Sequence, residues 1–194
     1  EGYGLNQAFS QVWKAWNDLS LNPSSQTERV VLVTQSQFLA DTFRTNYADL
    51  EAVQEEVDVA IQSSVDEANR LTREIADLNV KIIGHETPGN DANEFRDRRD
   101  LAVKELANII EISAFEDSEG RVMVSTANGR VLVQAGSNFE LSTLINAQNH
   151  LDVYWNDSTG ATNISDQIKS GKLKGLLEAR DVDIEGYKQQ LDTL

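Results

Sequence analysis

Two histidines and a group of acidic residues are the side chains that could bind a metal ion or exchange protons. His85 and His150 fall in separate polar loops, and neither has a second ligand at helical or hairpin spacing, so we expect no metal site at either. Glu55, Glu56 and Asp58 could form a carboxylate pair for acid–base chemistry. Because successive helix positions point about 100° apart, we expect these three carboxylates to face water instead.

The glycine-containing segments offer no better candidate for a bound ion or phosphate. Asn156–Gly160 resembles a calcium loop but lacks the spaced acidic ligands and the closing Glu. Gly171 and Gly175 do not have the spacing of a phosphate-binding loop. The chain has no cysteine, which excludes thiolate ligands, disulfides and cysteine nucleophiles. We therefore predict a non-enzymatic protein with no catalytic, cofactor-binding or metal residues and no cofactor.

The charge of the chain excludes two classes of partner. Of its 194 residues 17 are basic and 32 are acidic, and the net charge of -15 repels both nucleic acid phosphates and anionic lipid. No stretch of about 18 apolar residues occurs, so we expect no membrane span. The apolar share of 40% is ordinary for a folded protein and argues against global disorder.

Apolar residues near the N-terminus recur at helical spacing and predict a first helix that ends before Asn22-Pro23, with Asn6 as its N-cap. Trp13 and Trp16 are three residues apart on one face, where we expect them to pack in a core rather than stack on a ligand. The capping box Ser25–Glu28 after the end of the first helix predicts the start of a second. The apolar residues of the first helix are Leu5, Phe9, Val12, Trp13, Trp16 and Leu19.

The second helix carries the strongest periodic signal in the sequence. Neither Pro nor Gly interrupts it from Ser24 to Ile83, and a helix of about 60 residues is roughly 90 Å long, which predicts an elongated molecule. Two rows of mostly apolar residues alternate along it at spacings of three and four, the pattern of a helix packed along its length. One row is Phe43, Leu50, Val57, Ser64, Leu71 and Leu78, and the other is Val33, Ala40, Tyr47, Gln54, Ile61, Ala68, Ile75 and Ile82.

Helix breakers at Gly84–Asn90 predict a turn into a third helix, which begins with a capping box at Asp91–Glu94 and runs to about Ile110. A last helix begins near Leu173, and its heptad pattern is still running at Leu194, so we expect that the chain was cut within a helix. Short connections make neighbouring helices antiparallel. We therefore expect the first helix to cover the N-terminal half of the long helix, and the third and last helices its C-terminal half.

Between the third and last helices the apolar period changes to about 2, which predicts a small antiparallel sheet over residues 112 to 156. Asn128-Gly129 is the strongest hairpin signal, and we expect a type I′ turn there. Residues 156 to 165 are predicted to form a loop back to the helices.

The predicted fold is α+β and mostly α. It is an elongated antiparallel helical bundle built on one very long helix, with a small antiparallel β insertion. We divide the chain into the first part of a helical rod domain (1–111), the β insertion (112–164) and a returning helix of the rod (165–194).

Four segments in one order carry a family resemblance. They are Trp16–Ser24, Leu71–Leu78, Asp97–Asp100 with Leu101 and Leu106 after it, and Gly171–Asp181. With the long heptad helix and the β part between them, they cover nearly the whole chain and resemble the bacterial flagellar hook-associated protein 1 (FlgK) family. The resemblance implies a central fragment without the terminal polymerisation helices of that family, and a protein with no catalytic site and no cofactor.

The resemblance also implies a place and partners. Members of the family are secreted through the flagellar type III channel and form part of the bacterial flagellum outside the cell, at the hook–filament junction. The implied partners are the hook protein, hook-associated protein 3 and copies of the chain itself, and a fragment without terminal helices should be monomeric. Assembly contacts are expected on the helical rod, with Asp97–Asp100 as the candidate segment.

Two alternatives stay open from the sequence. The first is another secreted axial or filament subunit, such as a flagellin-like protein or a relative of hook-associated protein 3. The second is an intracellular coiled-coil binding module, for which we expect a strand-free chain that forms parallel dimers.

Overall fold

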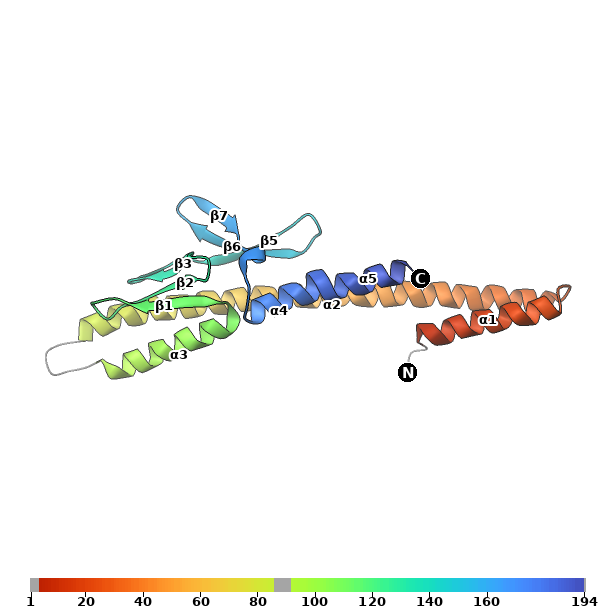
Figure 1. Ribbon diagram of the computed structural model, residues 1–194, viewed down its shortest axis with the longest axis horizontal. Coiled ribbons are helices and arrows are strands. Elements are labelled where there is room, and N and C mark those ends of the chain that lie inside the picture. Colours follow the sequence, from red (N-terminus) through yellow and green to blue (C-terminus); the bar gives the residue numbers. More distant parts are fainter. Residues whose placement is uncertain (1–3, 86–91, 194) are drawn as a thin grey trace. The chain divides into compact units, whose positions relative to one another are not determined.

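The computed structural model describes residues 4–85 and 92–193, and α2, a helix of 60 residues, is its longest element (Figure 1). The helices are α1 (Leu5–Leu21), α2 (Gln26–His85), α3 (Asn93–Ile109), α4 (Lys172–Glu178) and α5 (Glu185–Asp192), with a π-helix at Ala179–Ile184 and a short 3₁₀ turn at Ser165–Gln167. The chain forms two compact units, one of Glu1–Gln54 with Ile184–Leu194 and one of Glu55–Asp183, and α2 contributes to both. The predicted mostly α chain built on one very long helix is confirmed.

The N-terminal cap of α1 differs from the prediction. The helix begins at Leu5 with Gly4 as its N-cap, because the Gly4 carbonyl already accepts hydrogen bonds from the N–H groups of Gln7 and Ala8. Asn6 therefore lies inside the first turn and does not cap the helix. Glycine is a tolerated N-cap residue, so no side-chain oxygen is needed there.

The other predicted caps are met in part. The Ser25 hydroxyl accepts a hydrogen bond from the Glu28 N–H at 3.3 Å, as predicted for the start of α2. Helix α2 includes His85, which we expected in a loop. Most of the predicted turn, residues 86–91, lies outside the described residues, Asp91 included. The N-cap of α3 is Ala92, which has no side-chain oxygen, so the predicted capping box is wrong in its register.

In the first unit α1 packs against the N-terminal part of α2 through small side chains. Ala8 and Ala15 are buried, and the rings of Phe9 and Phe43 meet edge to face with centroids 5.8 Å apart. Trp13 and Trp16 are 68% and 60% exposed, so the expectation that they pack in a core is wrong. Because α1 approaches α2 through its alanine face, the larger indole side chains remain on the outer side of the helix.

Helix α5 contacts α2 at Tyr47 and Gln54, where the Lys188 ammonium lies 4.7 Å from the Tyr47 ring centroid and 3.2 Å from the Gln54 side-chain oxygen. The α5 part of the predicted last helix thus reaches the N-terminal half of α2, which we did not expect, whereas its α4 part joins the core of the C-terminal half as expected. Leu194, the final position of the predicted heptad, lies outside the described residues.

In the second unit the two apolar rows of α2 are buried. They form one core with α3, α4 and the strands, whereas Val33 and Ala40, at the start of the second row, are exposed. The rows are therefore fully buried from Ile61 to Ile82, and their positions before Gln54 are half-buried or exposed. The buried row positions of this unit are Ile61, Ser64, Ala68, Leu71, Ile75, Leu78 and Ile82.

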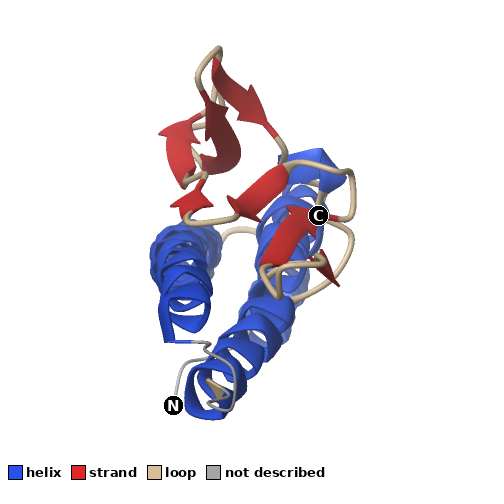
Figure 2. Ribbon diagram, turned by 90° about the vertical axis from the view of Figure 1, so that its left-hand side faces the viewer, coloured by secondary structure: helices blue, strands red, loops and turns tan. Residues whose placement is uncertain are grey.

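The strands lie on one side of α2 and α3 (Figure 2) and form two antiparallel sheets rather than the single sheet predicted. The first has the order β1-β2-β3-β4 and the second β5-β6-β7. Their bounds are β1 Ile112–Glu116, β2 Val122–Thr126, β3 Val131–Gln134, β4 Ser137–Asn138, β5 Leu141–Ile145, β6 Leu151–Asp157 and β7 Gly160–Asn163.

Strand β7 falls where we predicted a loop, so that prediction is wrong. The Asp157 carboxylate accepts hydrogen bonds from the Thr159 hydroxyl and from the N–H groups of Thr159 and Gly160, which closes a tight turn and returns the chain beside β6. The same bonds, those from Thr159 first, hold the pKa of Asp157 below its ordinary value. A mostly exposed edge strand does not need apolar residues, which is why its polar composition was misleading.

The predicted hairpin at Asn128-Gly129 is present between β2 and β3, but its turn is not type I′. Gly129 has a positive φ of 78° and donates its N–H to the Thr126 carbonyl at 2.8 Å, whereas Asn128 does not have a positive φ. A four-residue turn with glycine in the left-handed region at its end matches a type I turn followed by a bulge.

Candidate functional site

Of the residues considered for chemistry, the structure brings His150 and Asp58 together, with His150 Nδ1 3.3 Å from an Asp58 carboxylate oxygen. Across residues 4–85 and 92–193, no group of three or more His, Asp or Glu side chains is placed to hold a metal ion. No described helix is long and apolar enough to cross a membrane. Polar side chains of α2 instead join it to the strands, and three of them, Asp58, Asn69 and Asn79, bond to strand backbone in contacts that we call joints.

The Asn69 joint holds the start of β5. The Asn69 side-chain oxygen accepts the Leu141 N–H at 2.8 Å, and its amide nitrogen donates to the Leu141 carbonyl at 2.8 Å. The side-chain amide therefore replaces the neighbouring strand that this backbone would otherwise need. Both residues are buried, so neither bond is exchanged for water without cost.

The Asn79 joint holds the start of β2 in the same way. Its oxygen accepts the Val122 N–H at 2.9 Å, and its nitrogen donates to the carbonyls of Val122 and Ala135, each at 2.8 Å. Asn79 is 1% exposed. One side chain thus fixes β2 and the turn between β3 and β4 on α2.

The Asp58 joint holds the start of β6 and needs a second side chain. An Asp58 carboxylate oxygen accepts the Leu151 N–H at 3.0 Å, but a carboxylate cannot donate to the Leu151 carbonyl. Arg180 supplies that donor at 2.6 Å and also bonds to Asp58 at 2.5 Å, while His150 Nδ1 lies 3.3 Å from the other carboxylate oxygen. The prediction that Asp58 is a solvated residue is wrong, because its side chain is only 14% exposed.

Arg180 reaches this joint from the π-helix. Its side chain is fully buried, and its Nε and Nη2 atoms donate to the two carboxylate oxygens of Asp181 at 2.7 and 2.9 Å. Burial alone lowers the pKa of the Arg180 guanidinium, but the hydrogen bonds to Asp181 and Asp58 outweigh burial and raise it. The extra residue of a π turn changes which side chains point inward, and such turns are frequent at functional sites.

The spacing of the three joints explains why one helix can make them all. Asp58, Asn69 and Asn79 are 11 and 10 residues apart, close to the roughly 10.8 residues in three helical turns, so they share one face of α2. Each bonds to the first residue of a strand. The arrangement fixes both sheets at set positions along the part of α2 that belongs to the second unit.

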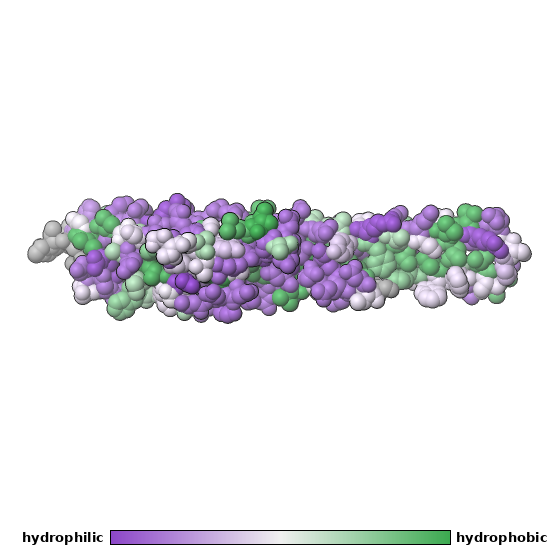
Figure 3. Space-filling model, turned by 90° about the horizontal axis from the view of Figure 1, so that it is seen from above, coloured by the Kyte–Doolittle hydropathy of each residue, from purple (hydrophilic) through white to green (hydrophobic). Residues whose placement is uncertain are grey.

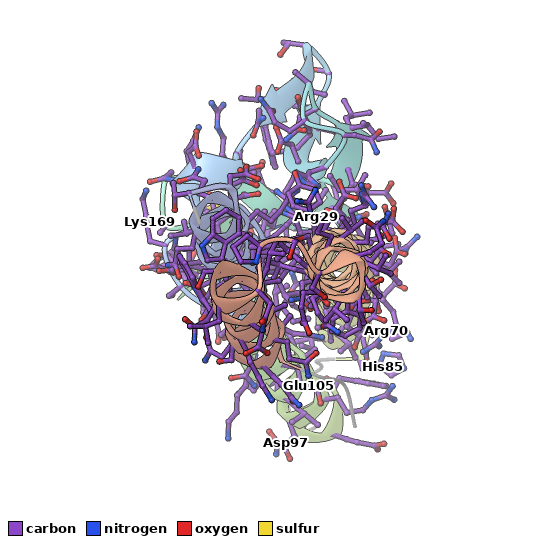
Figure 4. The ribbon with its side chains drawn as sticks, turned by 90° about the vertical axis from the view of Figure 1, so that its right-hand side faces the viewer. Arg29, Arg70, His85, Asp97, Glu105 and Lys169 are labelled. Atoms are coloured by element: carbon purple, nitrogen blue, oxygen red, sulfur yellow. The ribbon has the colours of Figure 1, made fainter. Side chains whose placement is uncertain are left out.

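The Asp97–Asp100 segment divides between the interior and the surface. Arg99 is 1% exposed and donates to the Gly120 carbonyl at 2.6 Å and to Glu116 at 3.2 Å. Asp97, Arg98 and Asp100 are exposed, and Asp97 points away from the strands (Figure 4). Arg99 therefore ties α3 to the first hairpin, and only its three neighbours are accessible to a partner.

Exposed apolar side chains gather in the first unit. Hydrophobic surface covers much of the region where Figure 1 draws α1 and the first half of α2 (Figure 3). The most exposed of these residues are Leu21, Trp13, Trp16, Tyr187, Val30 and Val33. A contiguous apolar surface of this kind is typical of a region that contacts another part of a protein or assembly.

The sequence analysis missed Asn69, Asn79 and Arg180 as joint residues. The sequence does contain a signal for the two asparagines. Asn is unfavourable inside a helix, and both asparagines lie among buried apolar positions, where a polar side chain needs a partner. Arg180 lies three residues after Leu177 in the heptad pattern of the last helix, and a charged residue at such a position needs a buried partner.

Comparisons with known proteins agree on one family. The model of the flagellar hook-associated protein FlgK helical domain matches residues 1–194. Flagellar hook-associated protein 1 of Bacillus subtilis is 26% identical over 192 residues, which cover 91% of this chain and 38% of the relative. The Salmonella typhimurium protein of the same name is 26% identical over 196 residues, covering 98% of this chain and 35% of its own.

A comparison with solved structures also finds the same fold. The flagellar hook junction protein FlgK from Burkholderia pseudomallei superposes with a TM-score of 0.88 at 21% identity, over 97% of this chain and 35% of that one. The chain thus spans little more than a third of the relatives that it matches.

Proposed function

The chain belongs to the FlgK helical-domain family, and from that premise we propose that it is the helical part of a non-enzymatic structural subunit at the hook–filament junction of a bacterial flagellum. The observation that carries the proposal is the family match over residues 1–194. We place the protein outside the cell, in the flagellum, with the hook protein, hook-associated protein 3 and copies of itself as partners.

The joints of the second unit support a mechanical role. A subunit between two rotating polymers has to transmit torque without local unfolding, and a part held by many buried polar bonds opens less readily than one held by exposed contacts. Asp58, Asn69 and Asn79 attach strands to a continuous helix through such bonds. The strands also count against the alternative of a strand-free coiled-coil module.

We also propose the domain division that the sequence predicts. Residues 112–164 would form the β insertion that the rod carries, between residues 1–111 and the returning helix of residues 165–194. The strands between Ile112 and Asn163 support this division. The chain by itself is proposed to be monomeric, since copies with a net charge of -15 repel each other at low salt.

A chimera tests the proposed function. In Bacillus subtilis the matching segment of hook-associated protein 1 would be replaced by residues 1–194, and swimming and filament attachment would be measured. We expect the chimera to restore attached filaments, and a chimera carrying Asn79→Ala and Asn69→Ala to restore fewer. A chimera that is secreted and folded but leaves the cells without filaments would contradict the proposal.

A further inference from the structure

Strand β1 forms an edge of the four-stranded sheet, with β2 on one side of it (Figure 1). Four of its five residues, Ser113 to Glu116, are exposed. Phe115 is 65% exposed and pairs across the sheet with Met123, which is 38% exposed. The edge therefore has an apolar pair directly beside it.

The backbone groups on the outer side of β1 can be identified from the bonds at its two ends. The Ala127 N–H donates to the Glu111 carbonyl at 3.3 Å, and the Asp117 N–H donates to the Arg121 carbonyl at 2.9 Å. In an antiparallel pair, bonded and non-bonded positions alternate. The N–H and C=O groups of Ala114, and of the residues two before and two after it, therefore point away from β2.

These outward groups have no partner among residues 4–85 and 92–193. The edge of β5, by contrast, is closed where Asn69 bonds to both backbone groups of Leu141. Strand β1 contains no Pro, no Lys and no bulge over five consecutive pairs, and its one charged residue, Glu116, is paired with Arg96 and Arg99 of α3.

The helices do not cover the edge either. Ala114 lies on the same face of the sheet as its cross-strand partner Val124, the face turned towards the helices. Val124 is fully buried there, whereas Ala114 is exposed. The helices therefore leave the strand open at Ala114, whereas Ile112 packs against the core and the Glu116 side chain is bonded by Arg96 and Arg99 of α3.

The chemistry of the edge specifies its occupant. Alternating N–H and C=O groups at strand spacing are matched by another extended backbone, and a side chain of that backbone would rest on Phe115. The acidic Glu111 lies directly before the strand, whereas Asp117 and Glu119, after its other end, are paired with Arg121. A second copy of the chain, also at -15, is electrostatically disfavoured as the occupant.

We propose that β1 is a docking edge to which an extended segment of a partner protein, apolar at alternate positions and basic at the end that lies beside Glu111, adds as a further strand. The segment would span the roughly 17 Å of a five-residue strand. The inference concerns the surface of the second unit and does not depend on the junction role.

A peptide titration tests the docking edge. The probe is the synthetic peptide acetyl-Lys-Val-Thr-Val-Thr-Val-Lys-amide, added to the isotope-labelled 194-residue chain while its backbone amides are followed by NMR. We expect saturable shifts centred on the amides of Ile112, Ala114 and Glu116. The same peptide with N-methyl groups on every valine and threonine should lose binding by at least about tenfold, because it lacks the central backbone donors on both edges.

Matched proline variants separate edge binding from stability. Ala114→Pro removes an outward N–H that takes no part in the ladder, so it should leave the fold intact and weaken binding at least about tenfold. Ala161→Pro is the control, because the bond from the Ile164 N–H to the Val153 carbonyl places the Ala161 N–H on the outer side of β7, in the other sheet. It should bind the peptide as the unchanged chain does.

Three results would overturn the inference. The first is the absence of saturable shifts at millimolar peptide, and the second is equal binding by the folded Ala114→Pro variant. The third is the finding that the unchanged chain forms a dimer and that the Ala114→Pro variant does not, which would assign the edge to a second copy. If Ala114→Pro fails to fold, the N-methylated peptide still decides, since equal binding of the two peptides excludes strand addition.

Discussion

Replacing Asn79 by Ala should destabilise the second unit more than replacing any exposed residue of α2 or α3 by Ala. The change leaves the N–H and C=O of Val122 without partners, and Val122 is 6% exposed. Each buried group left unpaired costs about 1 to 3 kcal/mol, and the Ala135 carbonyl, which is only partly buried, can bond to water instead. We therefore expect a loss of about 3 to 5 kcal/mol in the free energy of unfolding.

Urea unfolding followed by circular dichroism measures that loss, and hydrogen exchange at the Val122 amide locates it. The matched control is Asn108→Ala, because Asn108 is an exposed asparagine of α3, and it should change stability by less than about 0.5 kcal/mol. If Asn79→Ala and Asn108→Ala had equal small effects, the joint would contribute little and the reasoning would be refuted.

Further substitutions and a pH titration test other parts of the fold. Leu71→Ala should cost about 2 to 5 kcal/mol because Leu71 is 1% exposed, whereas Arg73→Ala, at an exposed position, should cost under about 0.5, as thermal melts would show. Gly171→Ala should lower the free energy of unfolding by at least about 2 kcal/mol, because φ at Gly171 is +88° and the new Cβ would lie 2.7 Å from a carbonyl oxygen of α3. Gly175→Ala is the control, because its Cβ would meet nothing within 4 Å, and it should not destabilise the chain. Because the pKa of Asp157 is lowered, its carboxylate stabilises the turn fully above the ordinary carboxyl pKa of about 3.9, and this stabilisation is lost as the pH falls through the lowered pKa. NMR of the turn amides during an acid titration can follow the loss, and a turn unaffected by acid would contradict this prediction.

The sequence was sufficient to predict the long helix because its signals are local. An uninterrupted run without Gly or Pro and a steady apolar period predicted residues 24 to 83, and the observed helix is Gln26–His85. The helix period also predicted the buried positions from Ile61 to Ile82, where other elements surround α2.

Contacts between distant segments could not be predicted in this way. Helical geometry gave the direction of the Asp58 side chain, but whether that direction meets water depends on Leu151 and Arg180, which lie 93 and 122 residues further along the chain. The exposure of Trp13 has the same cause, since α1 uses its alanines to approach α2. The boundary between the two sheets is a further long-range feature. Asn69 of α2 bonds to both backbone groups of Leu141, the first residue of β5, where a neighbouring strand would otherwise pair.

The most direct test of the proposed function is the position of the protein on the flagellum. Antibodies against residues 1–194 would be labelled with gold and applied to flagella of the source cells, then imaged by electron microscopy. The account predicts gold at a single site on each flagellum, between hook and filament. Gold along the whole filament, or on no part of the flagellum, would contradict it.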